Sequence, residues 1–399
     1  MNKGGNKMKK YLSFILLSLL LVTSIGAVWD IWSHNADQPE TFWTPSHAMI
    51  YLSVAGAGLT VLGVVIYECV KIGSFSPKRI PNVKGLALAG SGSVFQLLAG
   101  VSDDIYHSIF GFDVTMWSPP HVAVLYGAIL TLLGIFELKV EGSEIKSFFS
   151  SILAISMIFV VYQFSTFEYD MNFHASPVFP EDKNWDIIHR WKPYSAYLSI
   201  LLIPVLSYCL TLATKKFHFA IGTITTSFAF LIKYLIFIWY NGTILDLYFP
   251  LWIPLCGVIF DLVYILLKKT DRSFYYANLA AGMMLIFIVE IQNPLSMNVG
   301  KIGISLLGVS ILSILFTQFA LKGISLKGFH VSYVSVFLLI LFFPSIAWAH
   351  DGQKIIPVEK IAPDLHPLWL LLEFSIIFFL GYRLARFLSR IDRKKETKD

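Results

Sequence analysis

The sequence has little charge and little cysteine for its length. Only 14% of its 399 residues are charged, whereas an average soluble domain has roughly 25%. None of the three cysteines, Cys69, Cys209 and Cys256, has the paired spacing of a zinc site or of a disulfide framework. The shortage of charge excludes an ordinary soluble domain, and the cysteines are predicted to be packing residues.

Long apolar runs take the place of charge. Hydrophobic residues make up 56% of the chain, and the mean hydropathy is +0.66. Runs of about 18 or more apolar residues can cross a bilayer. They predict an all-α, polytopic membrane protein with about twelve spans, built from repeated helical hairpins. The predicted spans are 11–29, 47–67, 86–106, 120–138, 148–166, 195–214, 219–239, 250–267, 275–292, 302–321, 331–348 and 368–388.

We expect three regions: hairpins over residues 1–215, a further membrane bundle over 216–349, and an outer loop, a last span and a basic tail over 350–399. Lys and Arg gather in alternate loops and at both ends of the chain. By the positive-inside rule, both termini lie in the cytoplasm. The net charge of +5 therefore reflects topology in a cell membrane and does not predict nucleic-acid binding. The first apolar run could instead be a signal peptide cleaved near Ala27; we favour an uncleaved span.

One stretch at the end of the first predicted span combines a carboxylate with two imidazoles. It reads D-I-W-S-H-N-A-D-Q-P-E-T-F-W-T-P-S-H from Asp30 to His47. Asp30 and His34 are four residues apart and so share one helix face. His47 follows Pro45, where the next helix is predicted to begin.

The pattern returns in the second predicted hairpin as D-D-I-Y-H-S-I-F-G-F-D-V-T-M-W-S-P-P-H. Asp103, His107 and His121 take the places of the first three residues. A carboxylate and a His on one helix, with a His from the next, make a three-point metal site that leaves coordination positions open. Such ligands suit copper, zinc or non-haem iron, and the affinity order favours copper.

Acidic residues follow each set at matched places: Glu40 and Asp113 could orient the ligand imidazoles or be solvated loop acids. The ten histidines also lie mostly on one side of the predicted topology, since only His218 and His330 fall in cytoplasmic loops. Polar residues that merely collect where helices meet water would be shared between both faces. The uneven distribution favours metal binding at the extracytoplasmic face.

At these residues the chain resembles the C subunit of the copper membrane monooxygenases, the particulate methane and ammonia monooxygenase family. That family has a D-x3-H-x12-H set ending in F-T-P-S-H, which Asp30, His34 and His47 match with W-T-P-S-H. It has a second set, N-x3-H-x13-H, which Asp103, His107 and His121 match, with Asp in place of Asn. The resemblance covers roughly residues 11–138 and implies that each set is a copper site.

The resemblance implies a component of a monooxygenase that oxidises a small membrane-soluble substrate with O2. Electrons would come from a lipid-soluble donor such as a quinol, and carboxylates would relay protons. The partners would be the bilayer and A- and B-type subunits in an oligomer. The chain departs from the family in its additional spans, and it has no soluble copper-binding domain of the B-subunit kind.

Weaker candidates lie further along the chain. Asp170 and His174 repeat the four-residue spacing, and His350 follows an A-W-A end that either begins a polar loop or marks a cleavage site. Asp261 lies within an apolar span, where it could serve a proton path or be paired within the bundle. Two other functions remain open: a non-catalytic protein that binds, transfers or helps to assemble copper, and a haem electron carrier. The second is disfavoured because no His pair faces another across an apolar slot.

Overall fold

The computed structural model describes residues 3–35, 43–110, 119–140, 143–164, 202–218, 220–241, 253–267, 269–292, 299–322, 324–326 and 329–331. The chain divides into two compact units, one formed by residues 1–151 with 323–399 and the other by residues 152–322. The expected boundaries at residues 215 and 349 stay a prediction.

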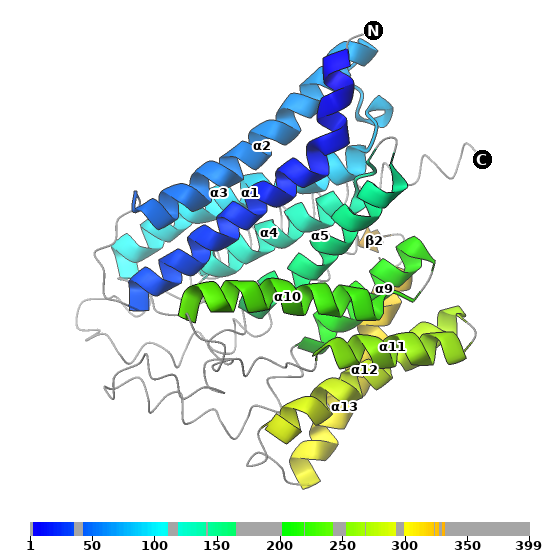
Figure 1. Cartoon of the computed structure of the whole chain (residues 1–399). Helices are drawn as coiled ribbons and strands as arrows, with labels where there is room; N and C mark the ends of the chain where they lie inside the picture. Colours follow the sequence, from blue (N-terminus) through cyan, green and yellow to red (C-terminus); the bar gives the residue numbers. More distant parts are fainter. Residues whose placement is uncertain are drawn as a thin grey trace. The chain divides into compact units, whose positions relative to one another are not determined.

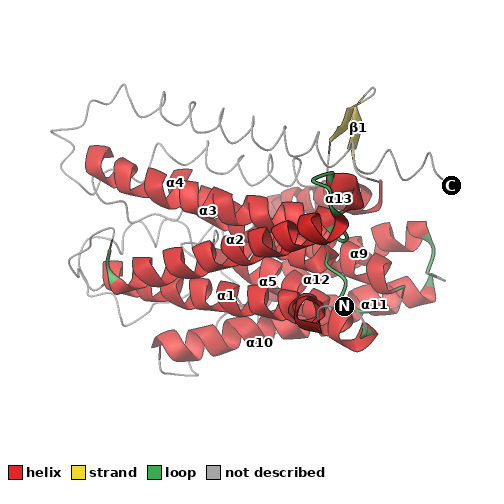
Figure 2. Ribbon diagram, turned by 90° about the horizontal axis from the view of Figure 1, so that it is seen from above, coloured by secondary structure: helices red, strands yellow, loops and turns green. Residues whose placement is uncertain are grey.

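The described secondary structure is helical apart from one small β-hairpin (Figures 1 and 2). The first unit holds α1 (Lys3–Asn35), α2 (Pro45–Ile72), the 3-10 turn η1 (Pro77–Arg79), α3 (Val83–Phe110), α4 (Pro119–Glu137), the start of α5 (Glu144–Phe164), β1 (Ile324–Leu326) and β2 (Phe329–Val331). The second holds the rest of α5, α9 (Leu202–Phe217), α10 (Gly222–Asn241), α11 (Ile253–Leu266), α12 (Asp271–Gln292) and α13 (Val299–Lys322). The two strands pair antiparallel, with Ser325 opposite His330. The predicted all-α class is confirmed for the described part.

Five of the described helices are long and apolar enough to cross a membrane. These spans are Tyr11–Asp30, Pro45–Ile72, Val83–Tyr106, Pro120–Glu137 and Glu144–Tyr162. Two further apolar helices are shorter, and α11, with 14 residues, is only about 21 Å long against a hydrocarbon core of about 30 Å. The described residues thus hold fewer full-length spans than the predicted dozen, and the last two predicted spans fall almost entirely outside them.

The first four helices follow one another up and down. Helix α1 packs on α2, α2 on α3 and α3 on α4. Because consecutive helices run in opposite directions, the last turns of α1 and α3 and the first turns of α2 and α4 lie at one end of this four-helix group. We call it the motif end, since the ligand motifs begin and end there.

Small residues allow α3 and α4 to approach closely. A Cβ atom on Gly127 would come within 2.7 Å of the Gly92 carbonyl oxygen. Thr131 Oγ1 donates a hydrogen bond to the Gly127 carbonyl oxygen (3.0 Å) and accepts one from Gln96 Nε2 (3.3 Å). Close contacts between small residues, reinforced by side-chain hydrogen bonds, are the usual means of packing helices in a bilayer.

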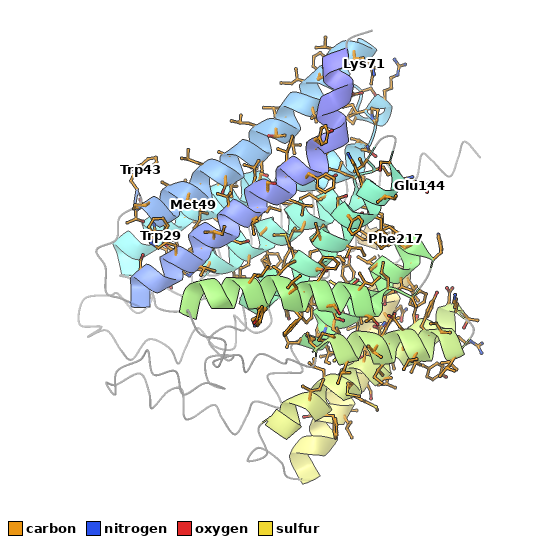
Figure 3. The ribbon with its side chains drawn as sticks, in the orientation of Figure 1. Trp29, Trp43, Met49, Lys71, Glu144 and Phe217 are labelled. Carbon is orange, nitrogen blue, oxygen red and sulfur yellow. The ribbon has the colours of Figure 1, made fainter. Side chains whose placement is uncertain are left out.

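The two ends of α2 differ in chemistry. Trp29 and Trp43 lie at the motif end, whereas Lys71 lies at the other end of the helix (Figure 3). Trp43 is 73% exposed, as expected of a tryptophan in the aromatic belt of a membrane protein. This polarity agrees with an outward-facing motif end.

Polar side chains join the helices of the second unit without charge pairs. The Asn278 amide of α12 donates hydrogen bonds of 2.7 Å to Thr211 Oγ1 of α9 and to Thr317 Oγ1 of α13. Asp261 of α11 accepts bonds from the backbone N–H groups of Gly222 and Thr223, at 2.7 and 2.8 Å. It therefore caps the start of α10, which favours a paired role over a proton path.

The cysteine prediction is confirmed. Cys69, Cys209 and Cys256 are all buried and all free thiols.

Candidate metal centre

The first Asp/His pair forms where the end of α1 meets the start of α2. Gly26 lies one turn before Asp30, and a Cβ atom there would come within 2.9 Å of Ile50 Cγ1 and 3.1 Å of the Ser46 carbonyl oxygen. The absence of a side chain lets the α1 backbone lie directly against α2. One turn later, Asp30 meets the first turn of α2, which begins at Pro45.

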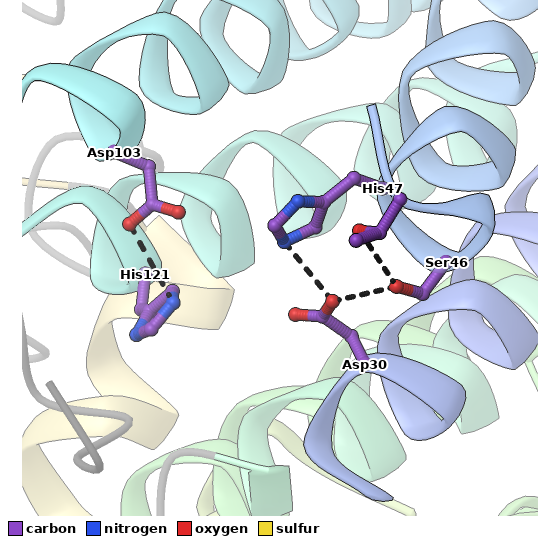
Figure 4. A network of polar contacts seen from close by, with 6 residues as sticks. Asp30, Ser46, His47, Asp103 and His121 are labelled. Atoms are coloured by element: carbon purple, nitrogen blue, oxygen red, sulfur yellow. Dashed lines mark hydrogen bonds and ion pairs between the residues drawn. The ribbon is translucent and has the colours of Figure 1, made fainter. Parts of the chain in front are cut away.

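The atoms of this first pair converge closely. His47 Nε2 lies 3.0 Å from Asp30 Oδ1, and the Ser46 hydroxyl donates a hydrogen bond of 2.8 Å to the same oxygen. Figure 4 shows the carboxylate between these two partners. Asp30, Ser46 and His47 are all buried, so the carboxylate is fixed by neighbours on α2.

The second pair has the same placement in the next hairpin. Asp103 lies on α3, and His121 is the third residue of α4, as His47 is of α2. His121 Nε2 lies 3.5 Å from Asp103 Oδ1 (Figure 4). Asp103 is buried, whereas His121 is only half-buried. The close packing of α3 on α4 brings these two residues together.

These separations fit two ligands of one metal ion. Ligand atoms about 2.0–2.1 Å from a tetrahedral ion lie roughly 3.3 Å from one another. The observed separations of 3.0 and 3.5 Å lie on either side of that value. A hydrogen bond between carboxylate and imidazole has a similar length, so the distances suit both a metal site and a direct pair.

Each set shows two of its three predicted members together. His34 lies on α1 four residues after Asp30, and His107 lies on α3 four residues after Asp103, but their side chains are outside the described part. Among the described residues, no group of three or more His, Cys, Asp or Glu is arranged to hold a metal ion. The predicted residues Glu40, Asp113, Asp170, His174 and His350 all lie outside the described residues.

Two neighbours of the pairs escaped the sequence prediction. Ser46 lies inside the repeated motif, where it looked like a helix-start residue, but it bonds Asp30 from across the hairpin. Tyr51 is one turn further along α2, and its ring centroid lies 5.8 Å from that of His47. The one available signal was the four-residue step from His47 to Tyr51, which puts both on one helix face.

No model of a known protein family, no characterised protein and no solved structure matches this chain. The likeness to the copper monooxygenase C subunit therefore rests on the two motifs themselves.

Proposed function

We propose that this chain is a membrane-bound copper protein, a C-subunit-like component of a monooxygenase that oxidises a small membrane-soluble substrate with O2. The observation that carries the proposal is the repeated geometry at the motif end. Two hairpins each bring an aspartate oxygen to 3.0–3.5 Å from an imidazole nitrogen. The same two positions are ligands in both motifs that resemble the family.

Asp30, His34 and His47 would hold one copper ion, and Asp103, His107 and His121 the other. A bound copper ion would supply one-electron redox chemistry and open coordination positions. The protein residues would hold the ion, exclude water and orient the ligands. Ser46 would fix the Asp30 carboxylate through its 2.8 Å hydrogen bond, and Glu40 and Asp113 would orient the imidazoles.

The proposed topology has about twelve spans, both termini in the cytoplasm and the motif end at the extracytoplasmic face. The tryptophans at the motif end and Lys71 at the opposite end of α2 support this orientation (Figure 3). A motif end at the membrane surface would be within reach of a quinol in the bilayer and of A- and B-type subunits in an oligomer.

The second candidate function is non-catalytic copper binding, transfer or assembly. The half-buried His121 favours it, because a ligand within reach of solvent allows an ion to be exchanged with a partner protein. This role requires the same ligands but neither substrate nor electron donor.

Turnover distinguishes these two functions. Copper-loaded protein in nanodiscs, with any co-purifying subunits, would be given a quinol, O2 and ammonia or a short alkane. The oxygenase proposal predicts quinol oxidation coupled to a hydroxylated product, lost in both His34→Ala/His47→Ala and His107→Ala/His121→Ala. Bound copper that passes to a chelator or an apo-protein without any product would overturn the oxygenase proposal and support the second function.

A further inference from the structure

Tyr51 spans the space between the two Asp/His pairs. On one side its ring lies 5.8 Å from the His47 ring, with the two planes 31° apart. On the other side it lies against the α3 backbone at Gly100, where a Cβ atom would come within 2.5 Å of Tyr51 Cε1 and 3.2 Å of Cζ. Any larger residue at position 100 would displace the ring.

The Tyr51 phenol also lies within electrostatic reach of both pairs. Gly100 is one turn before Asp103 on α3, so the ring rests beside the turn that carries this carboxylate. The charges of Asp103, Asp30 and Asp104 all act on the phenol, with that of Asp103 the strongest of the three. Tyr51 is thus in contact with one pair through His47 and near the other through Asp103.

The geometry points to Tyr51 as the residue that couples the two metal sites, so that an ion bound at one pair lowers the affinity of the other pair. The inference rests on the proposed function, because it concerns ions held by the same residues. Tyr51 here is a positioning residue and not a metal ligand.

The coupling follows from the chemistry of a phenol. A tyrosine hydroxyl has one hydrogen to donate, and two carboxylates compete for it. When an ion engages one carboxylate, the hydroxyl is left to the other. A hydrogen bond to a charged group must be given up or weakened before the second ion can bind, which lowers its affinity by about tenfold. Because binding free energies are reciprocal, either ion has the same effect on the other.

The test measures copper affinity by titration with Cu(II), followed by electron paramagnetic resonance, on full-length protein in nanodiscs. The affinity of the first pair is measured with the second pair intact and loaded, and again with it disabled by Asp103→Asn/His121→Ala. The ratio of the two dissociation constants is the coupling. We expect the coupling to fall by about tenfold in Tyr51→Phe, which keeps the ring against Gly100 and removes only the hydroxyl.

Two further variants separate this effect from general changes in structure. Tyr67→Phe removes a phenol hydroxyl from the same helix, about 24 Å away along its axis, and should leave the coupling at the wild-type value. Gly100→Ala displaces the ring and should change the coupling with all metal ligands intact.

The outcomes separate this inference from the function it rests on. Copper bound at both pairs, with the same coupling in Tyr51→Phe as in the wild type, would overturn the role of Tyr51 alone. Absence of copper from both pairs in the wild type would overturn the proposed function and this inference together.

Discussion

The two hairpins of the motif end place the same residues at the same helix positions but support them differently. In the first, W-T-P-S-H puts Ser46 next to His47, and its hydroxyl bonds Asp30. In the second, W-S-P-P-H puts Pro120 at that position, and proline has no hydroxyl to donate. The carboxylate–imidazole separation is 3.0 Å in the first hairpin and 3.5 Å in the second.

Burial differs in the same direction. The His47 side chain is 11% exposed and the His121 side chain 18%. The comparison separates two tasks within one motif. Helix ends and their prolines bring the ligand residues together, while one neighbouring residue decides how firmly the carboxylate is held. We therefore expect the first site to be tighter and the second to exchange its ion more readily.

Removal of an imidazole should break the comparison most strongly. His47→Ala should lower copper affinity at the first site by more than about 100-fold, because loss of a residue that only orients a ligand already costs 10–100-fold. His121→Ala should do the same at the second site. Equilibrium dialysis with elemental analysis measures both. His218→Ala, from the segment after α9, is the control, and an equal loss of copper there would contradict the assignment.

Loss of the supporting hydroxyl should make the first site resemble the second. Ser46→Ala removes the 2.8 Å hydrogen bond to Asp30 and should weaken copper binding at the first site by about 10–100-fold. Titration with Cu(II) measures the change. Ser53→Ala provides the control, since Ser53 bonds Thr23 on α1 (2.8 Å), away from the ligands. Equal weakening in both variants would mean that the α1–α2 contact in general, and not the carboxylate's partner, controls affinity.

Disruption of one interhelical contact should affect one hairpin only. A Cβ atom in Gly127→Ala would meet the Gly92 carbonyl oxygen at 2.7 Å, and such overpacking costs about 1–3 kcal/mol of stability. We expect a lower apparent midpoint of thermal unfolding and weaker copper binding at the second site, with the first site unchanged. Gly63→Ala is the matched control, because no atom lies within 4 Å of its added Cβ. Equal effects of the two substitutions would contradict the packing account.

The smallest effect should come from giving the second hairpin the residue of the first. Pro120→Ser supplies a hydroxyl at the position of Ser46 and should tighten copper binding at the second site by up to about tenfold, as one hydrogen bond to a charged group allows. Pro120→Ala removes the ring without adding a donor and separates the two effects. If both variants bind copper alike, the difference between the hairpins does not come from this hydroxyl.

Sequence patterns predicted much of the local structure. The apolar runs and the prolines placed the first four helices within a few residues of their observed bounds, because helix length and helix starts depend on nearby residues. The spacing of Asp30 and Asp103 from the prolines also predicted that each carboxylate meets an imidazole of the following helix.

Contacts between helices were predicted less well. The bond from Ser46 to Asp30 and the seat of Tyr51 on Gly100 depend on how two helices are rotated against each other, which a single sequence pattern does not specify. Asp261 was unresolved between two roles for the same reason, since its partners, Gly222 and Thr223, belong to another helix. Length alone also overestimated the number of full spans, as the 14-residue α11 illustrates.

The most direct test of the central claim is a count of copper in four purified proteins by elemental analysis and electron paramagnetic resonance. These are the wild type, His34→Ala/His47→Ala, His107→Ala/His121→Ala and the variant with all four substitutions. Two independent three-residue sites predict about two, one, one and no copper ions per chain, with two distinct spectra each lost in its own variant. The same metal content and spectrum in all four proteins would contradict the account and leave the Asp/His pairs as contacts between helices.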